Sequence, residues 1–366
     1  MADATDSKSV GGNPMRVRLS PRASVMLTSL FLALTQLAVA QKPALRGTIL
    51  AAESGDPLGF SIVSLHPGRG QQFTDAAGTF TFEIAKAGNY LLSVRQIGYA
   101  PFDTQLVIGD RATSVHITLR HLAIELPPVT ISATECTNPG PPDSSDAALR
   151  ALFDQLQENA RRYELLADSY PFRYALELAD RELNQRGDTG PPVVKKLYFS
   201  SSDNRHHPYA VGRVVERGWG PWGSDGVLVI RSAELDDLGN PDFIASHWFH
   251  LAGRDTIGGG GETLVRIDFE PAVRIQSADM AGAAYLDSST YELRYTTTRI
   301  TKPERSALMD VRTVTFRTRF RNITRGVPLQ DWLTAVTTYQ FGRRTNIQTQ
   351  RTAEVRFRRQ PPLPVP

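Results

Sequence analysis

Short apolar stretches alternate with turn residues over residues 43–133. Phe80, Phe82 and Ile84 stand two residues apart with polar residues between them, which is the period of a half-buried strand. Turn residues separate these stretches at regular intervals, and seven short strands are predicted in all. We therefore expect a seven-stranded antiparallel β-sandwich, with the architecture of immunoglobulin-like domains, in this part of the chain.

The apolar period changes to that of a helix after a run of turn-forming residues. Residues 134–145 include Asn138-Pro-Gly-Pro-Pro, and we expect a linker there. A helix is predicted over residues 146–167, where apolar side chains recur on one face, and Ser144 or Ser145 is expected to cap its start. The apolar positions of this face are Leu149, Leu152, Phe153, Leu156, Ala160 and Tyr163.

The period returns to two from residue 170 onward. Strands are predicted over 170–178, 193–200, 209–217, 226–232, 244–251, 263–269, 282–286, 291–300, 311–323, 332–341 and 352–358. Short turns and the lack of helix-length connections favour antiparallel pairing. Residues 146–359 should therefore form an α+β domain with a long curved antiparallel sheet and one main helix, in a chain that is mainly β. The Pro-rich residues 360–366 are expected to be a disordered tail.

The first forty residues have the pattern of an export signal. Residues 15–40 combine a basic start, an apolar run of about a dozen residues and the small-residue sequence Ala38-Val39-Ala40. Residues 1–14 are polar and are expected to be a disordered leader. The alternative for residues 15–40 is an N-terminal membrane anchor, although the apolar run is shorter than the ~20 residues that span a bilayer. No later segment reaches that length without charges, so we expect an exported protein without a transmembrane span.

The ordered elements of residues 43–133 resemble the carboxypeptidase-regulatory-like, or transthyretin-like, domain family. The resemblance is carried by Arg46-Gly-Thr, Ser54-Gly-Asp-Pro-Leu, Thr74-Asp-Ala-Ala-Gly-Thr-Phe-Thr-Phe and Gly88-Asn-Tyr-Leu-Leu-Ser-Val. Gly78 would allow a positive φ in a turn, and the aromatic residues after it would feed the core. The resemblance implies a folding module and not a zinc peptidase, and the chain has no His-x-x-Glu zinc pair.

A second resemblance lies in the C-terminal part. The pattern from Gly282 to Arg294 is similar to one found in outer-envelope half-barrel proteins, including lipoprotein-carrier-like folds. The resemblance implies a curved sheet that cradles an apolar or extended ligand, and it implies no catalysis. It also implies that the protein is located in the periplasm or is associated with the outer membrane.

Positive charge is concentrated toward the end of the chain. The whole chain has a net charge of +3, but residues 291–366 contain 15 Lys and Arg against 5 Asp and Glu. In the strand predicted over 311–323, apolar and arginine side chains should point to opposite faces. The arginines of this possible anionic-partner face are Arg317, Arg319, Arg321, Arg356 and Arg358. Either the face is simply solvated, or it docks to anionic lipid headgroups or an acidic partner. Nucleic acid is not expected as a partner, because the protein is exported and the face lacks interleaved aromatic residues.

No motif for catalysis, cofactor binding or metal binding stands out. Cys136 is the only cysteine and is expected to be inert. His206-His207 and His247-Trp-Phe-His250 are the histidine pairs, but on a strand residues three apart face opposite sides. The pair Asp236-Asp237 has turn-like surroundings, so we expect no shielded carboxyl there. We expect no enzyme activity, no cofactor and no metal.

Three functions remain open. The first is a non-enzymatic binding or assembly protein of the envelope, whose partner is an envelope lipid, a glycan or an outer-membrane protein. The second is an exported hydrolase with an unrecognised site, which would show a pocket with perturbed titratable groups. The third is a polysaccharide-binding or adhesion module, for which Trp219, Trp222 and Trp248 could form an exposed aromatic platform.

Overall fold

A computed structural model describes most of the chain after residue 43. The described residues are 44–68, 70–125, 139–143, 145–183, 186, 190–201, 209–217, 228–255, 263–308, 310–341 and 345–361. Residues 43–366 form one compact unit. The predicted leader (1–14), the predicted signal (15–40), Cys136 and residues 362–366 of the predicted tail lie outside the described residues.

The seven strands predicted for the first domain are present in two sheets. One sheet has the order β4-β1-β7, and the other has the order β3-β2-β5-β6. The strands are β1 (Ala44–Ala51), β2 (Ile62–His66), β3 (Gly70–Phe73), β4 (Thr79–Glu83), β5 (Gly88–Arg95), β6 (Phe102–Ile108) and β7 (Thr113–Leu119). One pair departs from the antiparallel pattern, because β1 and β7 run parallel, with Leu45 opposite Thr113 and Ala51 opposite Leu119.

The core of the sandwich lies between its two sheets, as the alternation of β4 predicts. Phe80 and Phe82 are buried, and they pack with fully buried residues such as Leu45 and Val63. Gly78 adopts φ +70° in the turn before β4, and a Cβ atom there would lie 2.5 Å from the carbonyl oxygen of Ile49. The turn therefore needs glycine for its conformation and for its space.

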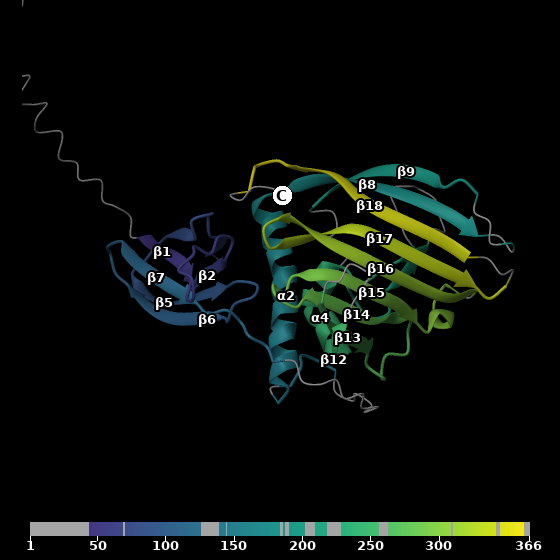
Figure 1. The fold of residues 1–366 in the computed structure, drawn as a ribbon, viewed down its shortest axis with the longest axis horizontal. Coiled ribbons are helices and arrows are strands. Elements are labelled where there is room, and N and C mark those ends of the chain that lie inside the picture. Colours follow the sequence, from purple (N-terminus) through teal and green to yellow (C-terminus); the bar gives the residue numbers. More distant parts are fainter. Residues whose placement is uncertain are drawn as a thin grey trace, which may run out of the picture. The chain divides into compact units, whose positions relative to one another are not determined.

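The second part of the chain is built on a nine-stranded antiparallel sheet, as predicted (Figure 1). Its order is β12-β13-β14-β15-β16-β17-β18-β8-β9, so the strand that follows the long helix pairs with the last strand of the chain. The strands are β8 (Phe172–Leu183), β9 (Val193–Ser200), β12 (His247–Asp255), β13 (Leu264–Pro271), β14 (Asp279–Asp287), β15 (Leu293–Thr301), β16 (Val311–Thr324), β17 (Val327–Tyr339) and β18 (Thr345–Phe357).

Two predicted strands are wrong in part. Residues 209–214 form no strand, and only β10 (Val215–Arg217) pairs with β11 (Leu228–Ile230) in a separate short ladder. Ile244 belongs to a short helix, α4 (Pro241–Ser246), which follows α3 (Leu235–Gly239).

The start of α4 explains the second error. Asn240 caps the helix by accepting hydrogen bonds from the backbone N–H groups of Asp242 and Phe243, at 2.8 and 3.3 Å. Pro241 occupies the first helical turn, where its missing N–H costs nothing. A sequence typical of a turn is therefore the start of a helix here.

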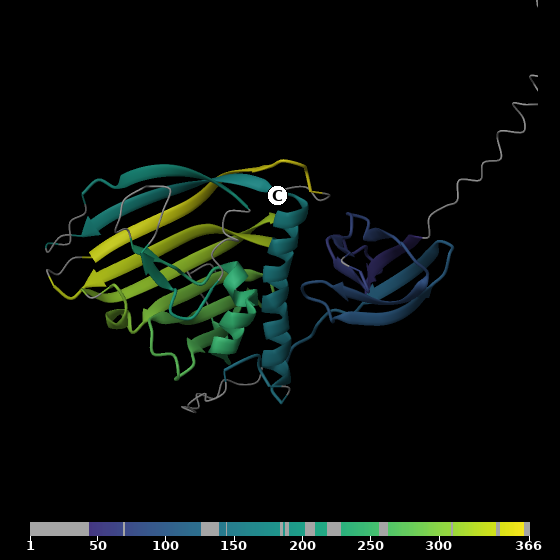
Figure 2. The same ribbon diagram turned by 180° about the vertical axis from the view of Figure 1, so that it is seen from behind.

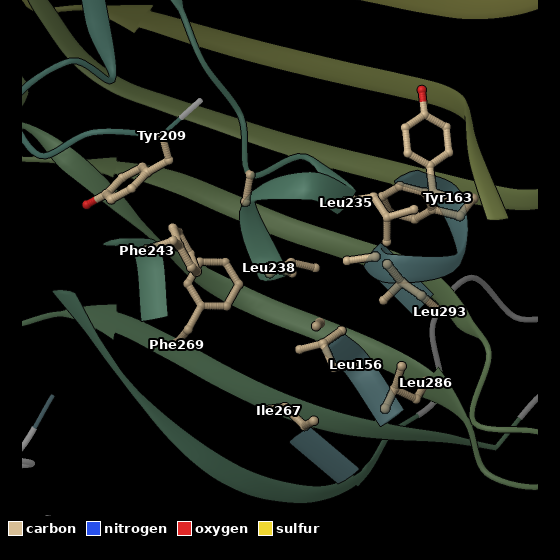
Figure 3. Packing of buried hydrophobic residues seen from close by; sticks show 14 of the residues in the cluster. Leu156, Tyr163, Tyr209, Leu235, Leu238, Phe243, Ile267, Phe269, Leu286 and Leu293 are labelled. Atoms are coloured by element: carbon tan, nitrogen blue, oxygen red, sulfur yellow. The ribbon is translucent and has the colours of Figure 1, made fainter. Parts of the chain in front are cut away.

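The predicted long helix is α2 (Ala147–Ser169), and its apolar side covers one face of the large sheet. Its N-cap is Asp146, which accepts a hydrogen bond of 2.9 Å from Leu149 N–H, so the predicted serine cap is wrong. Leu156 packs with Ile267 and Leu286 of the sheet (Figure 3). We call the face that α2, α3 and α4 cover the inner face, and Figure 2 shows these helices in front of it. The opposite face is the outer face.

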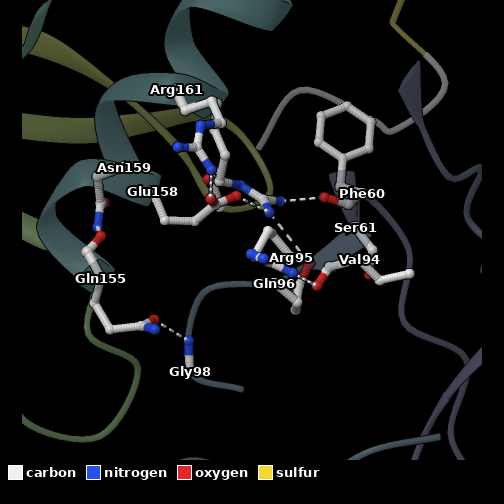
Figure 4. A network of polar contacts seen from close by, with 12 residues as sticks. Phe60, Ser61, Val94, Arg95, Gln96, Gly98, Gln155, Glu158, Asn159 and Arg161 are labelled. Atoms are coloured by element: carbon white, nitrogen blue, oxygen red, sulfur yellow. Dashed lines mark hydrogen bonds and ion pairs between the residues drawn. The ribbon is translucent and has the colours of Figure 1, made fainter. Parts of the chain in front are cut away.

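The other side of α2 carries polar side chains that are buried against the β-sandwich and neighbouring turns (Figure 4). Arg162 is fully buried, and its Nε donates to the Gly326 carbonyl oxygen at 2.8 Å. Its Nη1 donates to Gln96 Oε1 at 3.2 Å, and its Nη2 donates to the carbonyl oxygen of Phe60. One guanidinium group therefore joins the helix, the sandwich and the turn between β16 and β17.

Three further side chains of the same side of α2 extend this network. Gln155 Oε1 accepts a hydrogen bond of 2.8 Å from Gly98 N–H of the sandwich. Asn159 donates to the carbonyl oxygen of Tyr291 at 3.0 Å and accepts from Leu293 N–H at 2.9 Å. Glu158 lies 4.0 Å from Arg162 and is also buried, so the two charges partly compensate each other.

Replacing Arg162 with alanine is expected to lower the free energy of unfolding by about 3–5 kcal/mol, because Glu158 would lose its buried partner and the carbonyl oxygens of Phe60 and Gly326 would lose a hydrogen-bond donor. Equilibrium unfolding in urea would measure the loss. The neighbouring Arg161→Ala is the matched control, because Arg161 is half-exposed and also pairs with Glu158, at 3.4 Å. It should cost less than about 1 kcal/mol. Equal losses in the two variants would contradict the role given to Arg162.

Candidate ligand-binding site

A cavity of about 150 Å³ lies on the inner face, where the half of the sheet that contains β8 and β18 meets α2 and α3. Six elements that are far apart in the sequence contribute its walls. The lining residues are Tyr163 of α2, Tyr174 and Leu176 of β8, Phe199 of β9, Glu234, Leu235 and Asp236 at α3, Leu329 and Gln330 of β17, and Gln350 and Thr352 of β18.

Strand register places the sheet residues of this wall side by side. Tyr174 lies opposite Phe199 across β8 and β9, and the two rings stack with their centroids 5.8 Å apart. Leu176 lies opposite Thr352 across β8 and β18. In each strand, residues two apart point to the same face, so the aromatic and aliphatic groups continue along the inner face.

Tyr163 closes the cavity on the side of the helix. The ring of Tyr163 meets Phe172 edge to face at 6.4 Å, and Phe172 lies 6.1 Å from Tyr174. These aromatic contacts restrict the rings and give the cavity a preformed apolar wall. Figure 3 shows Tyr163 standing beside Leu235.

Side-chain amide groups of β18 can form hydrogen bonds on the sheet side of the cavity. Gln350 Nε2 donates to Gln348 Oε1 at 3.2 Å, and Gln348 Nε2 donates to Asp180 Oδ1 at 2.9 Å. This chain of side chains runs along the inner face away from Thr352. The cavity therefore offers an apolar wall together with a few polar groups that could orient a ligand.

Carboxyl groups line the α3 side of the cavity. Burial, together with the negative charge of nearby Asp237, raises the pKa of Glu234 to about 7 against the opposing effect of Arg231. Asp237 is itself buried, pairs with Arg231 at 3.2 Å and accepts a hydrogen bond of 3.0 Å from Glu234 N–H. Burial raises the pKa of Asp237 as well. The expectation of no shielded carboxyl at residues 236–237 is therefore wrong, because α3 folds back into the core.

A second buried polar cluster lies away from the cavity lining. Tyr209 donates to Asp279 Oδ2 at 2.8 Å, and the carboxylate of Asp279 lies 3.6 Å from His247 Nε2. The two ring nitrogens of His247 contact the carbonyl oxygens of Phe243 and Met280 at 2.8 and 2.9 Å. Burial lowers the pKa of His247 and raises that of Asp279. All three side chains are buried, which fits a structural network.

The histidine pairs give no chelating arrangement within the described residues. His247 begins β12 and points into the core, whereas His250 is three residues further along the same strand, where side chains face the opposite side. His206 and His207 lie outside the described residues. In the parts of the chain that the structure describes, no three His, Cys, Asp or Glu side chains gather as metal ligands.

The five arginines proposed as an anionic-partner face lie on or beside the outer face. Arg317, Arg319 and Arg321 alternate with buried residues along β16. Arg319 and Arg321 both bind Asp331, the latter pair at 2.7 Å, and the guanidinium of Arg317 lies 5.7 Å from the centroid of Tyr295. Arg356 is exposed in β18, and Arg358 follows the end of that strand.

Only one of the three tryptophans of the platform hypothesis lies in the part of the chain that the structure describes. Trp219 and Trp222 lie outside the described residues, and Trp248 is half-buried in β12. Trp332 of β17, which sequence reasoning overlooked, is 37% exposed on the outer face. Trp332 comes directly before the apolar Leu333 in a strand, so the sequence pattern could have indicated that the indole points to the opposite face from Leu333.

Comparison with known proteins confirms the first resemblance. Residues 44–120 match the carboxypeptidase regulatory-like domain family. No curated protein matches the sequence. No helix within the described residues is both long enough and apolar enough to cross a membrane.

Three solved structures show partial likeness. A LolA superfamily protein from Nitrosomonas europaea is 11% identical, with a TM-score of 0.29 over 57% of this chain and 94% of its own. A DUF1329 family protein from Desulfovibrio piger is 10% identical, with a TM-score of 0.30 over 56% and 93%. A membrane-associated protein of unknown function from Bacteroides fragilis is 13% identical, with a TM-score of 0.20 over 86% and 97%.

The raised pKa of Glu234 predicts a pH-dependent effect of Glu234→Gln. Ionisation of Glu234 costs stability as the pH rises from about 4.5 through about 7, whereas glutamine does not ionise. The variant should therefore gain about 1–2 kcal/mol relative to the native protein between pH 5 and pH 8. Urea unfolding at the two pH values would measure this gain. If the difference in stability between the variant and the native protein is the same at pH 5 and pH 8, the Glu234 carboxyl is not shielded.

Proposed function

We propose that the protein is a non-enzymatic, exported binding protein of the periplasm or outer membrane, which holds part of an envelope lipid or glycan in the inner-face cavity. The observation that carries the proposal is the cavity itself, with its wall of Tyr163, Tyr174, Leu176 and Phe199. Export is supported by the signal pattern of residues 15–40. An outer-membrane protein is the third partner class that fits this location.

The size of the cavity limits what it can hold. A volume of about 150 Å³ is comparable to engineered protein cavities that admit one benzene molecule. The cavity therefore suits one ring or a short apolar segment of a larger molecule. Gln350 and Thr352 lie beside that segment and could hydrogen-bond its polar groups.

The lining fits either of two kinds of ligand segment. Aromatic side chains pack against a sugar ring or an acyl segment through their apolar faces. Glu234 and Asp236 would favour a ligand that presents hydroxyl or amine groups at that end of the cavity. The same chemistry is present in glycans and in the headgroup regions of lipids.

An exported hydrolase is the second candidate, and Glu234 is the observation that favours it. A carboxyl with a pKa of about 7 in a cavity can act as a general acid, and Asp236 lines the same cavity. Turnover of envelope glycans or esters that Glu234→Gln abolishes would support the hydrolase. Binding without turnover would support the carrier-like function.

Filling the cavity should abolish binding. Leu176→Trp places an indole in the space, and we expect at least a tenfold loss of affinity for the uncharged apolar dye N-phenyl-1-naphthylamine. The endogenous ligand should also disappear from native mass spectra of mature protein purified from its own envelope fraction. Fluorescence titration and mass spectrometry provide the two measurements.

The control for the added tryptophan is Val107→Trp, because Val107 is 81% exposed on the sandwich. That variant should bind the dye like the native protein. Retention of dye and ligand in Leu176→Trp, with a normal melting temperature, would place binding elsewhere. An empty mass spectrum of the native protein would count against a carried ligand.

A further inference from the structure

Strand register lines up charged and aromatic side chains from five neighbouring strands on the outer face. Each residue lies directly opposite the next across the ladder. The set, which we call the outer-face row, is Arg319 of β16, Trp332 of β17, Arg351 of β18, Glu177 of β8 and Lys196 of β9. Figure 1 shows these five strands as consecutive neighbours in the sheet.

The row is open to solvent where it contains Trp332. The indole is 37% exposed, and the arginine side chains on either side of it, Arg319 and Arg351, are 52% and 62% exposed. Trp332 Nε1 donates to Thr334 Oγ1 at 3.0 Å, which ties the indole to its own strand. Neighbouring strands are ~4.8 Å apart, so a cationic side chain starts at about that distance on each side of Trp332.

Carboxylates on this part of the outer face are shared between cations. Asp331 binds both Arg319 and Arg321. Glu177 lies 3.8 Å from Lys196 and 4.0 Å from Arg351. Each of these carboxylates faces two positive side chains, so the surface keeps an excess of positive charge.

Further cations lie at the ends of the same strands. Glu354 contacts Lys196 and also lies 3.9 Å from Arg356. Arg173 of β8 lies directly opposite Arg356 of β18, and like charges in that position destabilise a sheet. An anion bound between these two arginines would reduce their mutual repulsion and so stabilise the sheet.

Exposed apolar residues lie beside these cations on β9. Tyr198 and Val194 are 69% and 64% exposed and flank Lys196 at two residues' distance, on the same face. Lys196 Nζ lies 5.9 Å from the centroid of the Tyr198 ring. The surface therefore combines Trp, Tyr, Val, Arg and Lys, with carboxylates in the minority.

We propose that the outer-face row docks the protein on a membrane surface of anionic lipids. Tryptophan and tyrosine prefer the depth of lipid headgroups, where their apolar rings are buried and their polar atoms stay hydrated. Arginine pairs with headgroup phosphates through two N–H groups, and each basic residue near such a surface adds to the attraction. Docking through this row would determine where the protein is held, and it does not depend on the ligand in the cavity.

Mature protein and its variants should be tested for co-sedimentation with vesicles of phosphatidylglycerol and phosphatidylcholine, against vesicles of phosphatidylcholine alone. Native protein should bind the anionic vesicles more tightly, and 0.5 M salt should weaken the binding. Arg317→Gln and Arg351→Gln should each lower the affinity about fivefold. Trp332→Thr, which keeps a residue suited to a strand, should also lower it.

Arg111→Gln is the matched control, because it removes one positive charge from an exposed position on the sandwich. It should bind anionic vesicles like the native protein, and circular dichroism should show unchanged melting for every variant used. Equal binding by Arg351→Gln, Trp332→Thr and native protein would overturn the proposal. So would capture of soluble polyglutamate through the same arginines without binding to vesicles, which would identify an acidic polymer as the partner.

Discussion

The whole arrangement depends on helix α2 being buried on two sides. One side packs Leu152 and Leu156 against the inner face of the sheet, as any amphipathic helix would. The other side faces the sandwich, so its polar groups lose water and must find partners within the protein. Gln155, Asn159 and Arg162 provide those partners by bonding to backbone groups of the sandwich and of two turns. Tyr163 of this helix lines the cavity together with residues of β8 and β9.

Local patterns in the sequence were sufficient for the classes of element and for most of their positions. The alternation of Val314 and Phe316 with polar residues is a property of β16 alone, so it could be recognised without knowledge of its neighbours. Helix α4 was missed because Asn240 and Pro241 are equally suited to a turn and to a helix start. The parallel pairing of β1 with β7 could not be predicted, because it joins strands more than sixty residues apart.

The inner-face cavity and the outer-face row are both built from residues that are far apart in the sequence. Tyr174 and Phe199 meet only through the register of β8 with β9. Trp332 lies between Arg319 and Arg351 only because β17 lies between β16 and β18. The sequence did show that the arginines share a face, since that follows from a period of two, but not which aromatic side chain accompanies them. The shift of the Glu234 pKa likewise arises from tertiary burial.

The parallel pairing of β1 and β7 determines at which end of the sandwich each of these strands begins. Two neighbouring strands that run in the same direction begin at one end of the sandwich and finish at the other. β1 covers eight residues, which is about 23 Å from its first residue to its last. The contacts with α2 through Gly98 lie near the finishing end, because Leu122 N–H bonds to the Gly98 carbonyl oxygen. The first residue of β1 therefore lies roughly the length of that strand away from the end of the sandwich that contacts the helix.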